Sequence, residues 1–118
     1  MSKKILVVDD VFDDLHVMKV LLEKEGYTVL SATNGAQALD VVRQTVPDLM
    51  LIDVRMPTLS GYDLLLLMRE KFNHKIKMLY VSIVPQKEVV LTDADGFIQK
   101  PFSPPVFIAA VKKVLKET

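Results

Sequence analysis

Short apolar runs alternate with amphipathic segments along the chain. Residues 5–8, Ile-Leu-Val-Val, form a continuous apolar run rich in β-branched side chains, which is typical of a strand buried on both faces of a parallel sheet. Four later runs repeat this pattern, two of them weakly. The sequence therefore predicts five strands, at residues 5–8, 29–30, 48–53, 77–82 and 96–100.

Amphipathic segments that fit helices lie between these strands. In the first, residues 13–25, the side chains of Leu15, Met18 and Leu22 recur at helical spacing and are expected on one face. Gly26 is suited to end this helix. The other predicted helices cover residues 34–44, residues 60–72 and a segment that starts at Pro104, and each has a side chain that can cap its start: Asn34, Ser60 and Ser103.

Strands that alternate with helices at this spacing predict an α/β fold, because right-handed crossovers place helices on both faces of a parallel sheet. Five strands fit the flavodoxin-like doubly wound arrangement, in which the strand order is 2-1-3-4-5. The chain shows no linker, repeat or low-complexity segment. We therefore expect a single domain over residues 1–118.

The segment between Ser82 and Lys100 is short for what it must contain. Its 17 residues have to supply two loops, a helix and most of a strand. Pro85 and two adjacent valines disfavour a long helix, and room remains for about two helical turns. We expect the helix of this segment, within residues 84–95, to be shortened, irregular or mobile.

Composition limits the possible functions. The chain has 118 residues, 50% of them hydrophobic, which suits one core. Fifteen Lys and Arg balance fifteen Asp and Glu, so no net positive field favours direct binding of nucleic acid. The absence of cysteine excludes disulfides and thiolate metal sites and fits a reducing cytoplasm. No apolar run approaches the roughly 20 residues of a membrane span, so we expect a cytoplasmic chain that is neither membrane-inserted nor secreted.

Polar side chains occur where the predicted strands end. Asp9 and Asp10 follow the first strand, Asp53 ends the third, Ser82 ends the fourth and Lys100 ends the fifth. In the order 2-1-3-4-5 the first and third strands are neighbours, so the three aspartates should meet at the carboxyl edge of the sheet. Three carboxylates at one place need a compensating cation, and Mg²⁺ is the cation that best suits such ligands.

Each of these residues also has an ordinary structural explanation. An Asp-Asp pair at a strand end often only starts a helix, a serine such as Ser82 often simply ends a strand, and a lysine before proline, such as Lys100, is usually solvated. Their joint position, at the ends of strands that are otherwise apolar, favours a common site.

Four motifs in this order resemble the receiver domain of two-component response regulators, and the resemblance covers essentially the whole chain. They are Val-Val-Asp-Asp at residues 7–10, Asp53-x-x-Met56-Pro57-x-x-x-Gly61, Ser82, and Lys100-Pro101-Phe102. The resemblance implies a phosphorelay switch. Such a switch accepts a phosphoryl group from a histidine kinase or histidine phosphotransfer protein and signals to a downstream protein target or an attached output domain.

The resemblance also assigns roles to individual residues. Asp53 would receive the phosphoryl group as an acyl phosphate. Asp10 would bind Mg²⁺ directly and Asp9 directly or through water, with Asp53 and the backbone carbonyl of Arg55 as further ligands. The domain would catalyse only its own phosphorylation and dephosphorylation.

Other implied roles concern the switch. Lys100 would pair with Asp53 and then with the phosphoryl oxygens, to which the Ser82 hydroxyl would also donate. Phe97, three residues before the lysine, occupies the position of the family's aromatic rotamer switch, although simple core packing explains it equally well. The Lys-Pro bond is cis in the family, which implies a cis bond before Pro101.

Three features depart from the family pattern. Val11 replaces an acidic residue that often follows the aspartate pair. Ile83 stands where a small residue usually follows the Ser or Thr, so its side chain is expected to crowd access to the phosphoryl site. The interval before Lys100 is shorter than usual, and the loss falls on the helix within residues 84–95.

Alternative functions remain open at this point. A receiver-like interaction module that phosphorylation no longer drives would keep the architecture, and Ile83 and the short helix allow it. A magnesium-dependent phosphatase also places an aspartate after its first strand, but those enzymes typically show Asp-x-Asp and carry an added cap segment. A flavin-binding domain of the same topology would need a phosphate-binding loop after the first strand, where this chain has Asp-Asp-Val-Phe.

Overall fold

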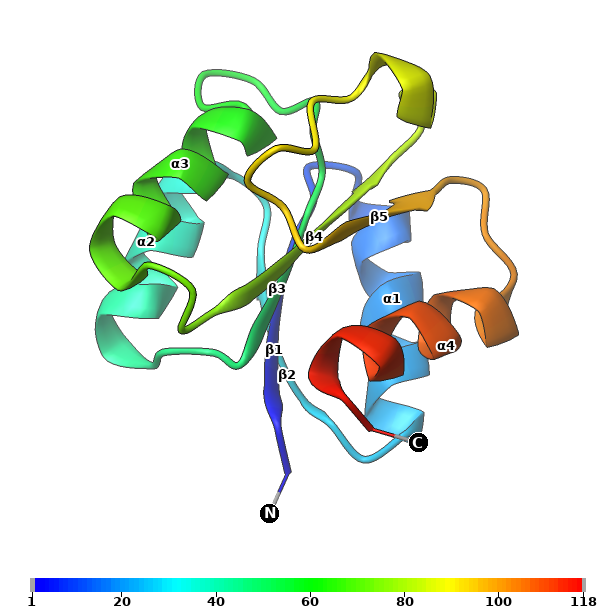
Figure 1. Cartoon of the computed structure of the whole chain (residues 1–118). Helices are drawn as coiled ribbons and strands as arrows, with labels where there is room; N and C mark the ends of the chain where they lie inside the picture. The colour runs from blue at the N-terminus through cyan, green and yellow to red at the C-terminus, as the bar shows by residue number, and fades with distance from the viewer. Residues whose placement is uncertain (1, 118) are drawn as a thin grey trace.

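Five parallel strands form one sheet in the order β2-β1-β3-β4-β5 in the computed structural model, which describes residues 2–117 (Figure 1). The strands are β1 (Lys4–Val8), β2 (Thr28–Ala32), β3 (Leu49–Ile52), β4 (Lys77–Ser82) and β5 (Gly96–Gln99). This is the flavodoxin-like doubly wound arrangement expected from the sequence, and the prediction of the strand order is confirmed.

Four α-helices connect or follow the strands: α1 (Phe12–Lys24), α2 (Gly35–Gln44), α3 (Gly61–Phe72) and α4 (Pro104–Leu115). The three predicted capping side chains accept hydrogen bonds from backbone N–H groups in the first turns of their helices. The oxygens of Asn34, Ser60 and Ser103 accept them at 2.8, 3.2 and 3.4 Å respectively. These bonds satisfy N–H groups that have no partner within the helix.

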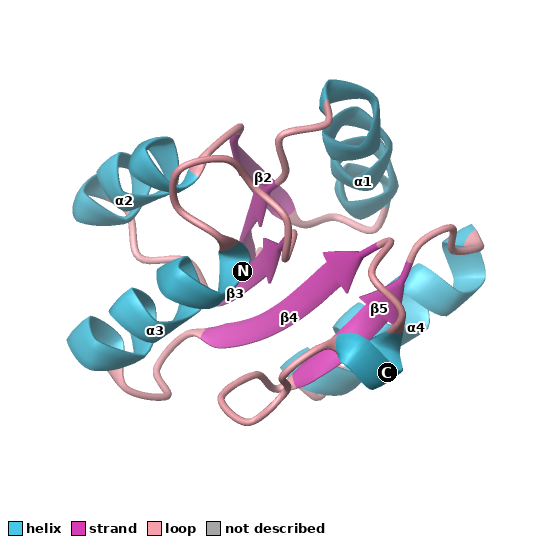
Figure 2. Cartoon of the chain, turned by 90° about the horizontal axis from the view of Figure 1, so that it is seen from above, coloured by secondary structure: helices cyan, strands magenta, loops and turns pink. Residues whose placement is uncertain are grey.

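The sheet separates two apolar cores, one on each face. Alternate residues of a strand point to opposite faces, so Leu6 packs with helices α2 and α3 while its neighbour Ile5 packs with α1 and α4. Seen from above, α2 and α3 lie on one side of the strands and α1 and α4 on the other (Figure 2). Burial on both faces explains why β3 and the interiors of β1 and β4 are apolar in unbroken runs.

The pairing register places the carboxyl ends of the strands at one edge of the sheet. Val8 on β1 pairs with Ile52 on β3, which in turn pairs with Tyr80 on β4. Ser82 at the end of β4 pairs with Gln99 on β5. The residues that end or follow these strands are therefore brought to the same edge. This geometry positions the candidate functional site.

A single 3₁₀ turn, η1 (Gln86–Glu88), lies between β4 and β5. An α-helix is absent from this connection within residues 83–95, all of which the structure describes. The prediction of a shortened or irregular helix is therefore confirmed. Mobility of the segment stays a prediction, and two of its side chains, Val84 and Val89, are buried in the core.

Arg69 on α3 anchors the second half of this connection. Its guanidinium donates to the carbonyl oxygens of Asp93 at 2.9 Å and Ile76 at 3.0 Å, and to the Asp95 carboxylate at 2.9 Å. The same Asp95 oxygen accepts the N–H of Met78 at 2.8 Å. These bonds tie the end of the connection to α3 and to the start of β4.

None of the helices within residues 2–117 is long and apolar enough to cross a membrane.

We expect the change Asp95→Ala to lower the free energy of unfolding by about 1 to 3 kcal/mol, because it leaves the N–H of buried Met78 and the Arg69 guanidinium without their shared acceptor. Urea unfolding measures this change, and hydrogen exchange should show faster exchange across residues 84–95. Asp93→Ala is the matched control, because Asp93 contributes its backbone carbonyl rather than its side chain. Equal stability of the two variants would contradict the anchoring role.

Candidate functional site

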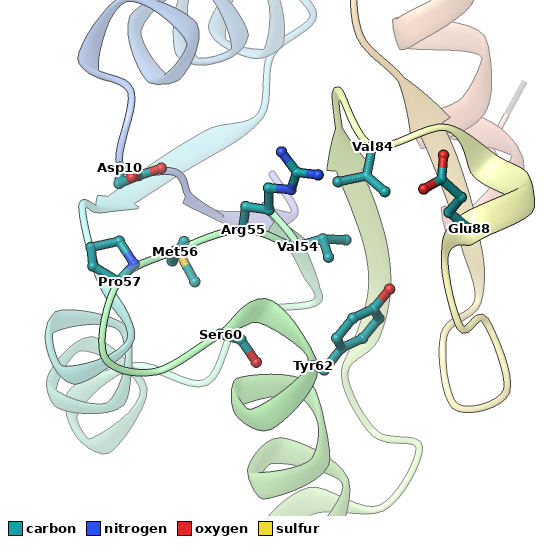
Figure 3. A pocket seen from close by; sticks show the side chains of 9 residues that line it. All are labelled: Asp10, Val54, Arg55, Met56, Pro57, Ser60, Tyr62, Val84 and Glu88. Atoms are coloured by element: carbon teal, nitrogen blue, oxygen red, sulfur yellow. The ribbon is translucent and has the colours of Figure 1, made fainter.

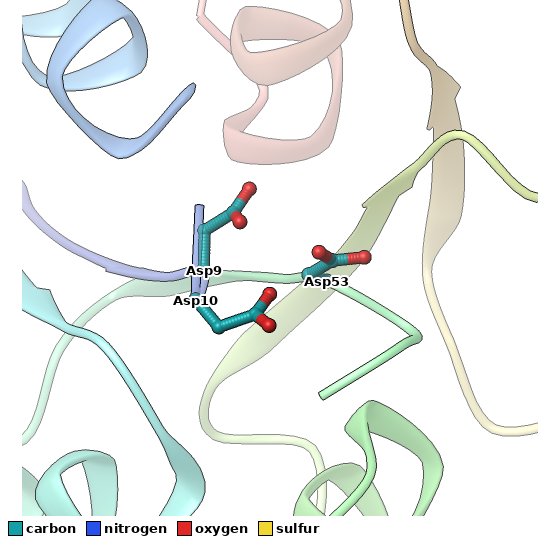
Figure 4. Close-up of side chains that lie close together, drawn as sticks. All are labelled: Asp9, Asp10 and Asp53. Carbon is teal, nitrogen blue, oxygen red and sulfur yellow. The ribbon is translucent and has the colours of Figure 1, made fainter. Parts of the chain in front are cut away.

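Three carboxylates meet at the carboxyl edge of the sheet. Asp9 and Asp10 come from the segment after β1 and Asp53 from the end of β3 (Figure 4). One oxygen from each lies within 4.8 Å of the others, and Asp9 and Asp53 are buried while Asp10 is exposed. The sequence-based prediction that these three side chains lie together is therefore met by the geometry.

Lys100 lies among these acids, but its hydrogen bonds go to residues other than Asp53. Its ammonium nitrogen is 2.6 Å from Asp9 Oδ2 and 2.9 Å from Asp14 Oδ2, whereas Asp53 Oδ2 is 3.8 Å away. Burial alone would lower the pKa of Lys100, but the hydrogen bonds to Asp9 and Asp14 outweigh it and raise that pKa above its ordinary value. The lysine is a fixed positive charge in this site.

Asp14 is a site residue that the sequence analysis missed. It lies in the first turn of α1, where acidic residues are common because they favour the positive end of the helix dipole. The pattern of apolar residues in this helix indicates only its buried face. A contact with a lysine 86 positions away leaves no signal in that pattern.

Burial raises the pKa of Asp53 to about 6. The positive charge of Lys100 opposes this rise, and the negative charge of Asp9 adds to it. Hydrogen bonds from the Arg55 N–H, at 3.3 Å, and from Ser82 also favour the charged form, but less strongly. Asp53 is therefore a carboxylate at neutral pH that has lost most of its water, which suits a nucleophile.

An open cavity of about 640 Å³ lies beside the acidic cluster. Asp10 lies on one side of it and Val84 and Glu88 on the other (Figure 3). The remaining lining residues come from the segment after β3 and the start of α3: Val54, Arg55, Met56, Pro57, Ser60 and Tyr62. The cavity gives solvent and small solutes access to the Asp10 side of the site.

The start of α3 lies directly against the backbone of Asp53. The N–H of Gly61 donates to the carbonyl of Val54 at 2.9 Å, and a Cβ atom on Gly61 would overlap the carbonyl oxygen of Asp53. Only glycine permits this close approach. The glycine at the end of the Asp53-to-Gly61 motif thus lets α3 pack directly against the backbone of Asp53.

The remaining predicted site residues lie around this cluster. Ser82 is fully buried, and its hydroxyl accepts the N–H of Val84 at 3.3 Å. The peptide bond before Pro101 is cis, as the resemblance implied. Phe97 is half-buried and packs against the core that faces α2 and α3, while Ile83 is 63% exposed.

A family model described as the response regulator receiver domain matches residues 5–112. The chain belongs to this family.

Receiver domains of known regulators resemble this one over its whole length. The alkaline phosphatase synthesis transcriptional regulatory protein PhoP of Bacillus subtilis is 36% identical over 100% of this chain and 50% of its own length. Response regulator GtcR of Aneurinibacillus migulanus is 32% identical over 98% of this chain and 49% of its own. The chain therefore spans about half the length of these curated relatives.

Solved structures show the same receiver architecture. The Vibrio cholerae chemotaxis protein CheY4 superposes with a TM-score of 0.89 at 26% identity, over 97% of this chain and 99% of its own. The response regulator TrrA of Thermotoga maritima, solved in complex with Mg²⁺ and BeF, gives a TM-score of 0.87 at 30% identity, over 95% and 98% of the two chains. Receiver domains are signalling domains rather than conventional enzymes, so the family favours signalling over the phosphatase and flavin-binding alternatives.

We expect the change Asp53→Asn to stabilise the metal-free receiver more at pH 7 than at pH 4.5, by about 1 to 3 kcal/mol. The folded-state pKa of about 6 lies above the unfolded value. Between these two pKa values the folded state holds a proton on Asp53 that the unfolded state has lost. The protonated Asp53 therefore stabilises the fold at low pH, and this stabilisation is lost as pH rises through about 6.

Urea unfolding in the presence of EDTA, at a series of pH values, measures this difference. Asp13→Asn is the control, since it removes one exposed carboxylate near the same site. A difference between wild type and Asp53→Asn that stays constant from pH 4.5 to 7 would show that burial does not raise the pKa of Asp53.

Proposed function

We propose that this receiver domain accepts a phosphoryl group on Asp53 in a magnesium-dependent reaction and signals by a change of conformation. The observation that carries the proposal is the position of Asp53, a buried carboxylate at the carboxyl edge of the sheet that lies within 4.8 Å of Asp9 and Asp10 and 3.8 Å from Lys100. The chain acts as one receiver unit over residues 1–118.

The reaction transfers a phosphoryl group from a histidine nitrogen to a carboxylate oxygen of Asp53. An Asp53 carboxylate oxygen attacks the phosphorus atom of a phosphohistidine, the phosphorus–nitrogen bond breaks, and the histidine nitrogen leaves with the bonding electrons. The product is an acyl phosphate on Asp53. Water later attacks this phosphorus and regenerates the carboxylate, so the domain catalyses only its own phosphorylation and dephosphorylation.

The oxygen donors at this edge fit Mg²⁺, which prefers one or two carboxylates together with water and phosphate oxygens. Asp10, Asp9, Asp53 and the backbone carbonyl of Arg55 would hold the ion. Asp10 is the most available ligand because its side chain is exposed, whereas both oxygens of Asp9 already accept hydrogen bonds, from Lys100 and the N–H of Val11. The bound ion would neutralise negative charge on the phosphoryl group.

Three side chains complete the proposed switch. Lys100 is within reach of Asp53, at 3.8 Å, and would contact the phosphoryl oxygens once they are present. The buried Ser82 hydroxyl would donate to another of these oxygens. Movement of Ser82 toward the phosphoryl group would then change the packing around Phe97, the half-buried aromatic on β5.

The proposed partners follow from the family. The phosphoryl donor is a histidine kinase or a histidine phosphotransfer protein, and the signal passes to a downstream protein target or an attached output domain in the cytoplasm. GtcR and PhoP are each about twice as long as this chain, which supports an attached output domain. The balanced charge of this chain supports a receiver that makes no direct contact with nucleic acid or membrane.

Intact-mass measurement with acetyl phosphate tests the proposal. We expect wild type to gain one phosphoryl group and Asp53→Asn to gain none. Chelation of the metal, or the change Asp10→Ala, should slow the gain by at least about tenfold, since a metal supplies several kcal/mol of charge stabilisation. A wild-type protein that gains nothing would instead support the interaction module that phosphorylation does not drive, and label elsewhere than Asp53 would refute the acceptor assignment.

We also propose that Ile83 restricts access of water to the acyl phosphate. Its side chain is exposed and lines a cavity of about 300 Å³ together with Lys100 and Asp14. Ile83→Ala should therefore speed loss of the phosphoryl group about two- to tenfold, because an attacking water needs an open in-line path. Val90→Ala, another exposed β-branched residue of the same connection, is the control, and equal rates in both variants would refute the restriction.

A further inference from the structure

The contact between Asp14 and Lys100 joins helix α1 to the end of β5. The Asp14 carboxylate lies 2.9 Å from the Lys100 ammonium, closer by 0.9 Å than the carboxylate of Asp53 at 3.8 Å. The carboxylate of Asp9 lies 2.6 Å from the same ammonium. The lysine is thus bound to two acids that are not the acceptor.

The two acids that hold Lys100 differ in exposure. The Asp9 side chain has no exposed surface, and Lys100 is the one cation paired with it among residues 2–117, so loss of this contact would leave a buried charge without compensation. The Asp14 side chain is 41% exposed, so water can solvate its carboxylate when the lysine leaves. The Asp14 contact is therefore the one that can break at small cost.

The proposed reaction asks Lys100 for new hydrogen bonds. The ammonium has three N–H donors, and it already donates to Asp9 and Asp14. A phosphoryl group on Asp53, whose carboxylate is 3.8 Å away, competes with these two acids for the same donors. Every interaction that Asp14 makes with Lys100 in the unphosphorylated state therefore opposes donation to the phosphoryl oxygens. The negative charge of Asp14 beside the lysine also opposes the approach of an anionic donor.

We infer that Asp14 is a positioning residue that holds Lys100 away from Asp53 and thereby slows phosphoryl transfer to the acceptor. This inference rests on the proposed function, because it concerns the rate at which Asp53 is phosphorylated. Asp14 contacts neither the acceptor nor the phosphoryl group and acts only through Lys100. Removal of its carboxylate frees the lysine for the phosphoryl oxygens.

The test compares Asp14→Asn, Asp14→Glu and Asp13→Asn with wild type. In acetyl phosphate, Asp53 attacks the phosphorus atom and acetate leaves with the electrons of the broken bond. With Mg²⁺ present, Asp14→Asn should be phosphorylated about three- to tenfold faster than wild type, the scale of one charged hydrogen bond that is partly exposed. Asp14→Glu restores a carboxylate that can reach Lys100, and its rate should return toward that of wild type.

Asp13→Asn is the matched control, because it removes the same charge from the same helical turn, and its side chain makes no ion pair among those of residues 2–117. A second readout needs neither metal nor phosphate. Nitrogen NMR of the lysine ammonium groups in the metal-free protein should show a changed Lys100 resonance and faster exchange of its protons in Asp14→Asn. Asp13→Asn should leave both unchanged.

The outcomes separate this inference from the proposed function. Wild type that gains no phosphoryl group overturns the proposed function and the inference with it. Wild type that is phosphorylated, while Asp14→Asn reacts at the rate of Asp13→Asn or more slowly, overturns the inference alone. An unchanged Lys100 resonance in Asp14→Asn would show that the two side chains are not paired in solution.

Discussion

The ammonium group of Lys100 makes the acidic edge of the sheet possible. Asp9 and Asp53 are almost without solvent, and two desolvated carboxylates at one place are stable only beside a positive charge. Lys100 supplies that charge from the end of β5, reaching Asp9 at the end of β1 across the ends of β4 and β3. Lys100 also donates to Asp14, which ties the start of α1 to the end of β5. The charge balance between Asp9 and Asp53, and a direct contact between α1 and the end of β5, both depend on this one side chain.

Much of the fold could be predicted because burial leaves a direct mark on sequence. β1, β3 and β4 are covered on both faces, so their residues are apolar in unbroken runs. β2 gave a weak signal, a run of only two residues, because it lies at the edge of the sheet and carries half-exposed or polar positions such as Ser31. The aspartates were found by the same logic, since residues that follow parallel strands share one edge.

Contacts that depend on three-dimensional reach could not be predicted in this way. Asp14 belongs to the polar residues of α1, and nothing local distinguishes it from Asp13, its neighbour in the same turn. The anchoring of the β4–β5 connection by Arg69 joins residues 24 and 26 positions apart, through hydrogen bonds to the backbone carbonyl of Asp93 and the side chain of Asp95. The length of that connection ruled out a full helix, but its path depends on where one arginine on α3 can reach.

The close approach of Gly61 to Asp53 has a consequence for how this receiver can diverge. The exposed surface of α3, including Leu66, can change without disturbing Asp53, because those side chains point to solvent. The first residue of the same helix cannot change, since any side chain there displaces the Asp53 carbonyl. One helix thus combines an exposed surface that tolerates substitution with a first residue that must stay glycine, so α3 can acquire new surface contacts while the backbone of Asp53 keeps its position.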